Sequence, residues 1–191
     1  NPYFLFVGSL NKAKDIPTML KCFVMFLERR KKEERHDKIY DLYLIGGDYW
    51  PDPAIEETID KFHLEDRVKK IGFVPDAELP KYYRGALAFV TTALQEGFCL
   101  PAVEAMACRT PVVALGRGAL PEVVGEGGIV VSTQYTVKST QAALAEAMMK
   151  MTDKKTRERR AKKAIAQAKK FRWEAFAQHI LNCIANGYTT D

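Results

Sequence analysis

The sequence predicts an α/β fold in which a doubly wound, Rossmann-like parallel sheet carries helices on both faces. Short apolar segments alternate with helical segments along the whole chain of 191 residues. The short segments are apolar at nearly every position, which is typical of strands buried on both faces of a parallel sheet. The Gly-containing loops follow these strands, and such sheets bind ligands beyond the carboxyl ends of their strands. We therefore expect a ligand site among these loops.

The first expected strand, residues 3–7, leads to a helix whose start is marked by Asp15 as the cap and Pro17 in the first turn. Apolar residues follow the helical period to residue 27, and we expect the polar tail, residues 28–38, to fray into an exposed loop. Apolar runs predict five more strands, at residues 42–45, 68–71, 86–90, 112–114 and 128–131. Helices are expected at residues 54–62, 78–83, 101–107, 120–124, 136–151, 154–170 and 173–186, with Gly187 as the final stop.

The composition indicates a globular protein with a core. The length fits one domain, residues 1–191, and the hydrophobic fraction is 47% with 28% charged residues. No apolar run approaches the roughly 20 residues that a membrane-spanning helix needs. The opening segment NPYFLFVGSL has no signal-peptide pattern. Because the chain does not start with Met and enters a strand almost at once, we expect it to be part of a longer protein.

The cysteines and histidines show no metal-binding pattern. Cys22, Cys99, Cys108 and Cys183 lack Cys-x-x-Cys or Cys/His spacing, so we expect free thiols, no metal and a reducing, cytoplasmic compartment. The three histidines lie far apart in helical or loop segments, and we expect them to be non-catalytic. Trp50 follows a Gly-Gly-Asp-Tyr segment, where it could shield a ligand or be a surface hydrophobe.

The positive charge is concentrated near the C-terminus. Residues 154–170 contain nine Lys or Arg and one Glu, so this segment carries a charge of +8. The rest of the chain carries −3, which gives the net charge of +5. The simplest interpretation is a solvated helix face. The alternatives are a nucleic-acid or an anionic-membrane surface. No aromatic residues interleave with these charges, so we expect no nucleic-acid partner, and peripheral membrane contact is the better functional alternative.

Two acids flank the start of an expected helix in the segment QEGFCLPAVEAMACRTPVV. Glu96 precedes Gly97, and Glu104 lies one turn into the helix that follows Pro101. The N–H groups of such a first turn form an anion site, and carboxylates accept hydrogen bonds from sugar hydroxyls. This arrangement suits a ligand that combines phosphate with hydroxyl groups. On spacing alone, however, a solvated loop acid and an acid that complements a helix N-terminus remain the stronger interpretation.

Several motifs in register resemble the family 4 glycosyltransferases, also described as glycosyl transferases group 1. They are EGFCLPAVEAMACRTPVVA, GALPEVVGEGGIVV, YFLFVGSLNKAKDIPTML, LYLIGG, VKKIGFVPDAELPKYYRGALAFV and FRWEAFAQHIL. Together they cover nearly the whole chain. The family has the GT-B architecture, in which two Rossmann-like domains face a cleft. The resemblance implies that this chain is one half of a GT-B enzyme, the C-terminal domain that binds the nucleotide-sugar donor, and that an N-terminal acceptor domain lies outside it.

The resemblance also implies roles for individual residues. Glu96 would bind hydroxyls of the transferred sugar, Glu104 would accept from the ribose hydroxyls, and Lys14 would neutralise the diphosphate leaving group. Gly8 would let the first loop approach the phosphates. The backbone near Phe73 and Val74 would hold the base. The backbone amides of four residues would contact the sugar and phosphate: Gly97, Phe98, Cys99 and Leu100.

The sequence departs from the family pattern at the phosphate loop. Many members have an Arg where this chain has Ser9, or else an Arg where it has Ala13. One positive charge is therefore missing beside Lys14, and Lys12 could replace it only with a different spacing. Cys99 and Arg109 also stand where the family commonly has glycine.

The resemblance implies a retaining, metal-independent transferase without a cofactor. It would move a mannose- or glucose-type hexose from a UDP- or GDP-sugar to a glycan, lipid or small-molecule acceptor, in the cytoplasm or at the inner membrane face. The isolated chain is expected to bind donor weakly and to be inactive. The first alternative is a non-catalytic nucleotide-binding or interaction module. The second alternative is a sugar-nucleotide epimerase or a phosphorylase of the same architecture. A phosphorylase would need a sequence context for a pyridoxal-phosphate lysine, which we do not see.

Overall fold

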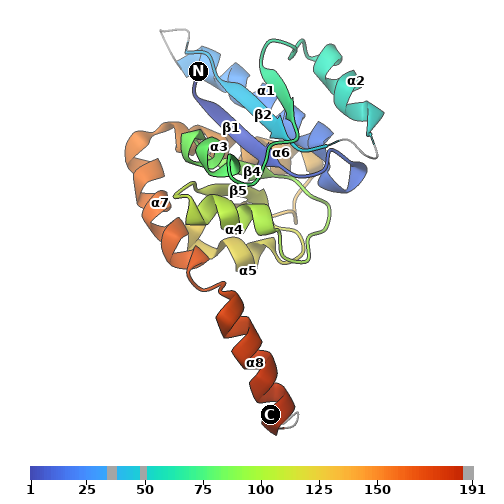
Figure 1. Cartoon of the computed structure of the whole chain (residues 1–191). Helices are drawn as coiled ribbons and strands as arrows, with labels where there is room; N and C mark the ends of the chain where they lie inside the picture. Colours follow the sequence, from blue (N-terminus) through green and yellow to red (C-terminus); the bar gives the residue numbers. More distant parts are fainter. Residues whose placement is uncertain (34–37, 48–50, 187–191) are drawn as a thin grey trace.

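The computed structural model describes residues 1–33, 38–47 and 51–186. Its centre is a six-stranded sheet in the order β3-β2-β1-β4-β5-β6, and every neighbouring pair is parallel (Figure 1). The predicted α/β, doubly wound class is therefore confirmed. The strands are β1 (Tyr3–Val7), β2 (Asp41–Ile45), β3 (Val68–Gly72), β4 (Phe89–Thr91), β5 (Val112–Leu115) and β6 (Gly128–Val131).

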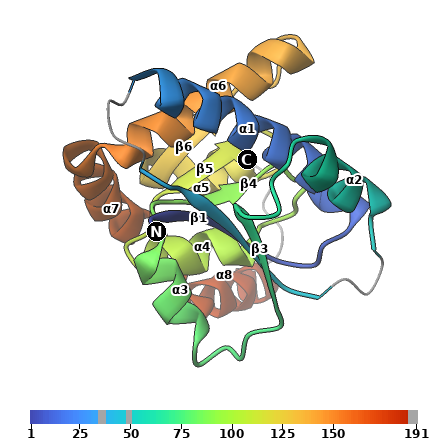
Figure 2. The same cartoon turned by 90° about the horizontal axis from the view of Figure 1, so that it is seen from above.

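Helices cover both faces of the sheet (Figure 2). One face packs against α1 (Ile16–Glu33), α2 (Pro53–Lys61) and α6 (Val137–Thr152) in the larger apolar cluster. The other packs against α3 (Leu79–Gly85), α4 (Leu100–Ala107), α5 (Leu120–Val124) and α7 (Lys154–Ala168). Two short 3₁₀ helices, η1 (Lys12–Lys14) and η2 (Gly125–Gly127), and the C-terminal α8 (Trp173–Asn186) complete the described elements. The central strands β1, β4 and β5 are buried on both sides, which explains their apolar sequences, whereas the edge strand β3 exposes Lys70.

The strand order reverses between β1 and β4. Strands β2 and β3 lie successively on one side of β1, and the chain then crosses over so that β4 pairs with the other side of β1. Because β1 and β4 are parallel neighbours, the loops that follow them begin side by side at the carboxyl ends of the strands. This switch point is where open parallel sheets form their ligand crevice.

The first helix is longer than predicted. Its polar tail does not fray at residue 28, because α1 continues to Glu33. Arg29 holds it to α6 through an ion pair with Glu146, with 2.7 Å between Nη1 and Oε2. Arg30 donates to the hydroxyl of Tyr40 at 3.1 Å. A tail that is polar in sequence is thus fixed by tertiary contacts that helical periodicity does not reveal.

The basic segment forms α7, and part of its charge stabilises neighbouring elements. Arg157 donates to the carbonyl of Met151 at the end of α6, and Lys163 pairs with Glu126 of η2 at 3.0 Å. The helix ends at Ala168 rather than at the predicted residue 170. Four other basic residues of α7 are exposed, as the solvated-face interpretation expects: Lys154, Lys155, Arg159 and Lys162.

The last helix, α8, projects away from the body of the fold (Figure 1). Its large apolar side chains are exposed, including Trp173, Phe176 and Ile184. Within the described residues, none of the helices combines the length and the apolar character required to cross a bilayer. The predictions for His36, Trp50 and Gly187 lie outside the described residues.

Candidate functional site

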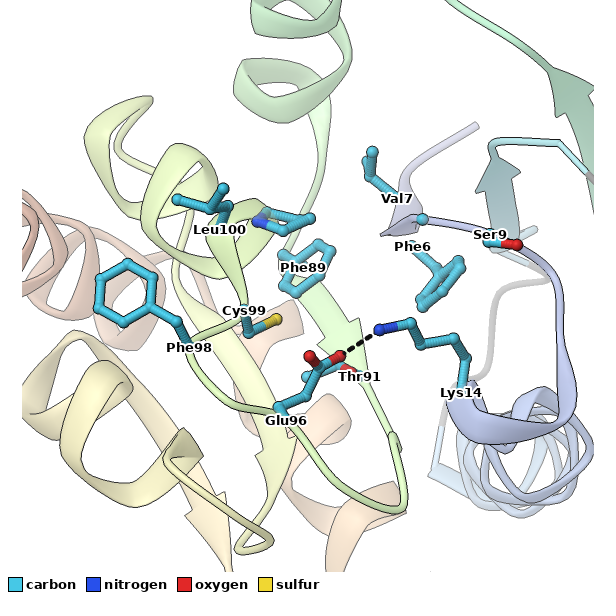
Figure 3. A pocket seen from close by; sticks show the side chains of 12 residues that line it. Phe6, Val7, Ser9, Lys14, Phe89, Thr91, Glu96, Phe98, Cys99 and Leu100 are labelled. Atoms are coloured by element: carbon cyan, nitrogen blue, oxygen red, sulfur yellow. Dashed lines mark hydrogen bonds and ion pairs between the residues drawn. The ribbon is translucent and has the colours of Figure 1, made fainter.

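A cavity of about 470 Å³ opens at the switch point, between the loops after β1 and β4 (Figure 3). Aromatic rings of the strands form its floor, and polar side chains come from the loops. Seven predicted site residues line it: Gly8, Ser9, Lys14, Glu96, Phe98, Cys99 and Leu100. The remaining lining residues are Phe6, Val7, Phe89, Thr91 and Pro101.

Lys14 and Glu96 meet in this cavity although 82 positions separate them in the sequence. The Lys14 Nζ atom lies 2.6 Å from Glu96 Oε1, and the two side chains are only 25% and 13% exposed. Lys14 comes from η1 after β1, and Glu96 comes from the loop between β4 and α4 (Figure 3). Each side chain of the pair neutralises the charge of the other. An anionic ligand that takes over Lys14 would release the Glu96 carboxylate to accept hydrogen bonds from hydroxyl groups.

The N-terminus of α4 also faces this region. Cys99 occupies the N-cap position in a left-handed conformation, with φ of 68°, and provides no side-chain cap. Pro101 stands in the first turn, where its missing N–H is tolerated. Burial, and then the charge of Glu96, raise the pKa of the Cys99 thiol to about 11, so the thiol is neutral at pH 7. The result is an uncapped helix start, with its partial positive charge, beside the cavity.

Glu104 lies outside the cavity. Its side chain is exposed on α4, and its Oε2 accepts a hydrogen bond of 2.8 Å from the hydroxyl of Tyr83 in α3. Tyr83 is only 1% exposed, and its own carbonyl accepts from Thr110 at 2.5 Å. Burial, and then the hydrogen bond to Glu104, raise the pKa of Tyr83, so its proton remains in that bond. One oxygen of Glu104 is therefore fixed by a buried group.

The other predicted residues also lie apart from the cavity lining. Phe73, directly after β3, is 77% exposed, whereas Val74 beside it is buried in the core. Gly97 is exposed and does not line the cavity. The structure thus gathers the predicted sugar and phosphate contacts other than Gly97 in one cavity, and the predicted ribose and base contacts lie outside its lining.

The second cation of the family pattern, already absent from the sequence at Ser9 and Ala13, is not supplied by another described residue of the cavity lining. Among the described lining residues, Lys14 is the sole Lys or Arg. Ser9 lines the cavity where the family pattern has an Arg, and its Oγ accepts from Asn11 Nδ2 at 3.3 Å. Lys12 is exposed and is not a lining residue, so the structure does not place it as a replacement.

The described residues contain no cluster of three or more His, Cys, Asp or Glu side chains arranged to hold a metal ion. The cysteines Cys22, Cys99, Cys108 and Cys183 are free. Cys22 is fully buried in α1, whereas Cys183 in α8 is half-buried.

Three residues near the site were missed by sequence reasoning. Tyr83 binds Glu104, while Arg117 and Thr92 contact the loop that carries Lys14. No motif marks these residues, because each acts through a partner that is distant in sequence. Only the geometry of the folded loops identifies them.

The fold and the cavity define a Rossmann-like α/β domain with a candidate ligand site at its switch point. Residues 1–171 match the family model described as "Glycosyl transferases group 1". The chain therefore belongs to the group 1 glycosyltransferase family. The chain is similar to O-antigen chain mannosyltransferase B of Escherichia coli, with 32% identity over 181 residues, which cover 94% of this chain and 45% of that protein.

Solved structures show the same fold. Anabaena HepE in complex with UDP superposes with a TM-score of 0.78 at 21% identity, covering 97% of this chain and 49% of that one. The C-terminal domain of a glycosyl transferase group 1 family protein, LpcC of Francisella tularensis, has a TM-score of 0.68 at 22% identity, covering 88% of this chain and 85% of that one. The chain thus spans less than half of the mannosyltransferase and about half of HepE, but most of an isolated C-terminal domain.

Proposed function

We propose that this chain is the C-terminal, donor-binding half of a retaining glycosyltransferase that takes a mannose- or glucose-type hexose from a UDP- or GDP-sugar. One observation carries the proposal: Lys14 and Glu96 converge in the cavity at the switch point, beside the N-terminus of α4. A cation and helix N–H groups suit a diphosphate, and a partly buried carboxylate suits sugar hydroxyls. The family of the chain supports the same class of reaction.

The chemistry requires that negative charge growing on the leaving diphosphate be stabilised while the sugar is held in place. In the proposal, Lys14 and the amides at the start of α4 meet that charge, in a cavity where electrostatic interactions are stronger than in water. Glu96 leaves its ion pair with Lys14 and holds the sugar hydroxyls, so it orients the substrate. We assign it no role as a covalent nucleophile, because the acceptor would attack from the face that the diphosphate leaves.

The nucleoside would lie outside the cavity, along the carboxyl edge toward β3. Glu104 would accept from the ribose hydroxyls with the oxygen that Tyr83 does not bind. The backbone at Phe73 and Val74 would hold the base, next to the exposed ring of Phe73. This division explains why the two acids, Glu96 and Glu104, lie in different surroundings.

The acceptor site belongs, in this proposal, to an N-terminal domain outside the chain. Its acceptor would be a glycan, a lipid or a small molecule, and the isolated chain would bind donor without transferring sugar. The transfer would need neither a metal ion nor a cofactor, so a chelator should leave the rate of the whole enzyme unchanged. The reaction would take place in the cytoplasm, with the exposed basic residues of α7 available for peripheral contact at the inner membrane face.

Calorimetric titration of the chain with UDP, GDP and their hexose conjugates tests the proposal. Binding of one nucleotide series, with the sugar conjugate bound differently from the bare nucleotide, is the expected result. The matched control is Arg29→Met, which removes an ion pair between α1 and α6 far from the cavity and should bind as the unaltered chain does. Absence of binding to all four ligands at millimolar concentration would exclude a donor site.

A second candidate function is a non-catalytic nucleotide-binding or interaction module. The observation that favours it is Ser9, which leaves Lys14 as the sole Lys or Arg among the described lining residues. Such a module would bind nucleotide but would neither transfer nor hydrolyse the sugar. The whole protein, incubated with the donor that binds, separates the two functions through release of UDP or GDP.

A further inference from the structure

The loop between β5 and α5 contacts Glu96 and the segment that carries Lys14, although it does not line the cavity. Three consecutive residues make these contacts. Arg117 reaches the segment that carries Lys14, whereas Gly118 and Ala119 lie against the backbone of Glu96. This loop therefore connects the two segments whose side chains must meet in the cavity.

Arg117 binds two acceptors from different strand ends. Its Nη1 lies 3.2 Å from Asp15 Oδ2, directly after Lys14, and 3.0 Å from the carbonyl oxygen of Thr92, after β4. The Thr92 hydroxyl lies 2.9 Å from the carbonyl oxygen of Asp15 and 3.2 Å from that of Lys14, so it can donate to either. Thr92 is fully buried, and the Arg117 and Asp15 side chains are 27% and 20% exposed. These bonds join the β1 and β4 loops behind the cavity.

The carboxylate of Asp15 was expected to cap α1, but the hydrogen bond that the structure gives it is the one to Arg117. Asp15 does precede α1, and its carbonyl accepts from Thr18 at 3.1 Å. However, its backbone is left-handed, with φ of 50°, and is not the extended conformation of a capping residue. The side chain is thereby directed toward the β5–α5 loop.

The Glu96 side of this connection depends on close backbone contact. The N–H of Ala119 donates to the Glu96 carbonyl at 3.0 Å. Gly118 has φ of 55°, and a Cβ atom there would overlap the carbonyl oxygen of Glu96. The loop can therefore approach Glu96 only because residue 118 is glycine.

We infer that Arg117 is a positioning residue for the donor site: by joining Asp15 and Thr92, it holds Lys14 at the place where it meets Glu96 and the diphosphate. The inference rests on the proposed function, and it adds a residue that no family motif quoted above supplies. It is most important in this chain because Lys14 is the sole Lys or Arg among the described lining residues. With a single cation, a small displacement of its backbone removes the main attraction for diphosphate.

The test is a double-mutant cycle in the whole protein that carries this chain, titrated with UDP and with GDP. Arg117→Met keeps the length of the side chain and removes its charge and hydrogen bonds. Asp15→Asn removes the partner charge, and Asn tolerates the left-handed conformation. Each variant should weaken nucleotide binding roughly tenfold, a size typical of coupled residues in contact. In a protein that already carries Lys14→Ala, adding Arg117→Met or Asp15→Asn should lower nucleotide affinity little further, because Arg117 acts through Lys14.

A purely structural Arg117 gives a different pattern. Its substitution would lower the unfolding temperature and weaken binding to the same extent with and without Lys14. Arg29→Met, which likewise removes an ion pair of an arginine, here with Glu146, is the control for general destabilisation. Additive losses with Lys14→Ala, or nucleotide affinity in Arg117→Met and Asp15→Asn equal to that of Arg29→Met, would overturn the inference alone. If the unaltered protein bound neither nucleotide, the proposed function would fall first and the inference with it.

Discussion

Glu96 and Glu104 are eight positions apart, yet the fold gives them opposite surroundings. Glu96 is 13% exposed, lines the cavity and pairs with a cation, whereas Glu104 is exposed, lies outside the cavity and accepts from the buried hydroxyl of Tyr83. An incoming anion competes with Glu96 for the charge of Lys14, whereas Glu104 accepts from a neutral phenol, which attracts an anion less strongly. The proposed function accordingly assigns the two acids to different parts of one ligand.

The largest expected effect is on the Glu96 side. Lys14→Ala removes the sole lining Lys or Arg among the described residues and leaves Glu96 uncompensated in a partly buried place. A lost hydrogen bond to a charged group is worth about 1.5–3 kcal/mol, so nucleoside diphosphate binding should weaken about 10- to 150-fold. Calorimetry with the binding nucleotide measures this. Lys14→Arg, which keeps the charge, should recover part of the affinity, and an unchanged dissociation constant in Lys14→Ala would show that the diphosphate lies elsewhere.

On the Glu104 side, Tyr83→Phe removes only the hydroxyl that fixes the carboxylate. We expect a loss of about 1 kcal/mol, roughly fivefold in nucleotide affinity, because Glu104 is no longer oriented toward the ribose. The loss should disappear with the 2′,3′-dideoxy nucleotide, which has no hydroxyl for Glu104 to bind. Tyr82→Phe, at the half-buried neighbouring tyrosine, is the control. Equal losses with both nucleotides would mean that Tyr83 acts only on stability.

The two ends of α4 provide a comparison of stability. Cys99 precedes the helix with φ of 68°, and Arg109 follows it with φ of 67°, a conformation that favours glycine. Arg109 is exposed, so Arg109→Gly should stabilise the protein by about 1 kcal/mol, or roughly 2–4 °C in melting temperature. Cys99→Gly should increase the stability less, because this substitution also removes a buried thiol from the core. A larger gain at Cys99 than at Arg109 in thermal unfolding would contradict this explanation.

The last comparison concerns pH. In the folded chain the pKa of Cys99 is raised from 9.0 to about 11, so between these values the unfolded chain has lost a proton that the folded chain keeps. The contribution of the Cys99 thiol to the free energy of unfolding is therefore fully present below pH 9. It is lost as the pH rises to 11, on the order of 1 kcal/mol per pH unit. Cys99→Ser should therefore make the loss of unfolding free energy in denaturant titrations shallower over this range. Cys183→Ser on α8 is the control, and identical slopes in all three proteins would refute the assignment.

The fold could be predicted from the sequence because its signals are local. Apolar strands, helical periods and a Pro in a first turn placed nearly every described element within a few residues, and parallel strands bring the loops with Lys14 and Glu96 to one edge. What failed depended on distant partners. The tail of α1 is held by α6, and the carboxylate of Asp15 binds Arg117 instead of capping α1. Such pairings follow from tertiary geometry, which spacing in one chain does not encode.

The central claim is that Glu96 holds the sugar and Glu104 the ribose. It is tested most directly by titrating Glu96→Ala and Glu104→Ala with the bare nucleotide and with its sugar conjugate. Glu96→Ala should weaken only the sugar conjugate, and Glu104→Ala should weaken both ligands alike, each by about 1.5–3 kcal/mol. Equal losses of both ligands in both variants would contradict the separate assignment of the two acids.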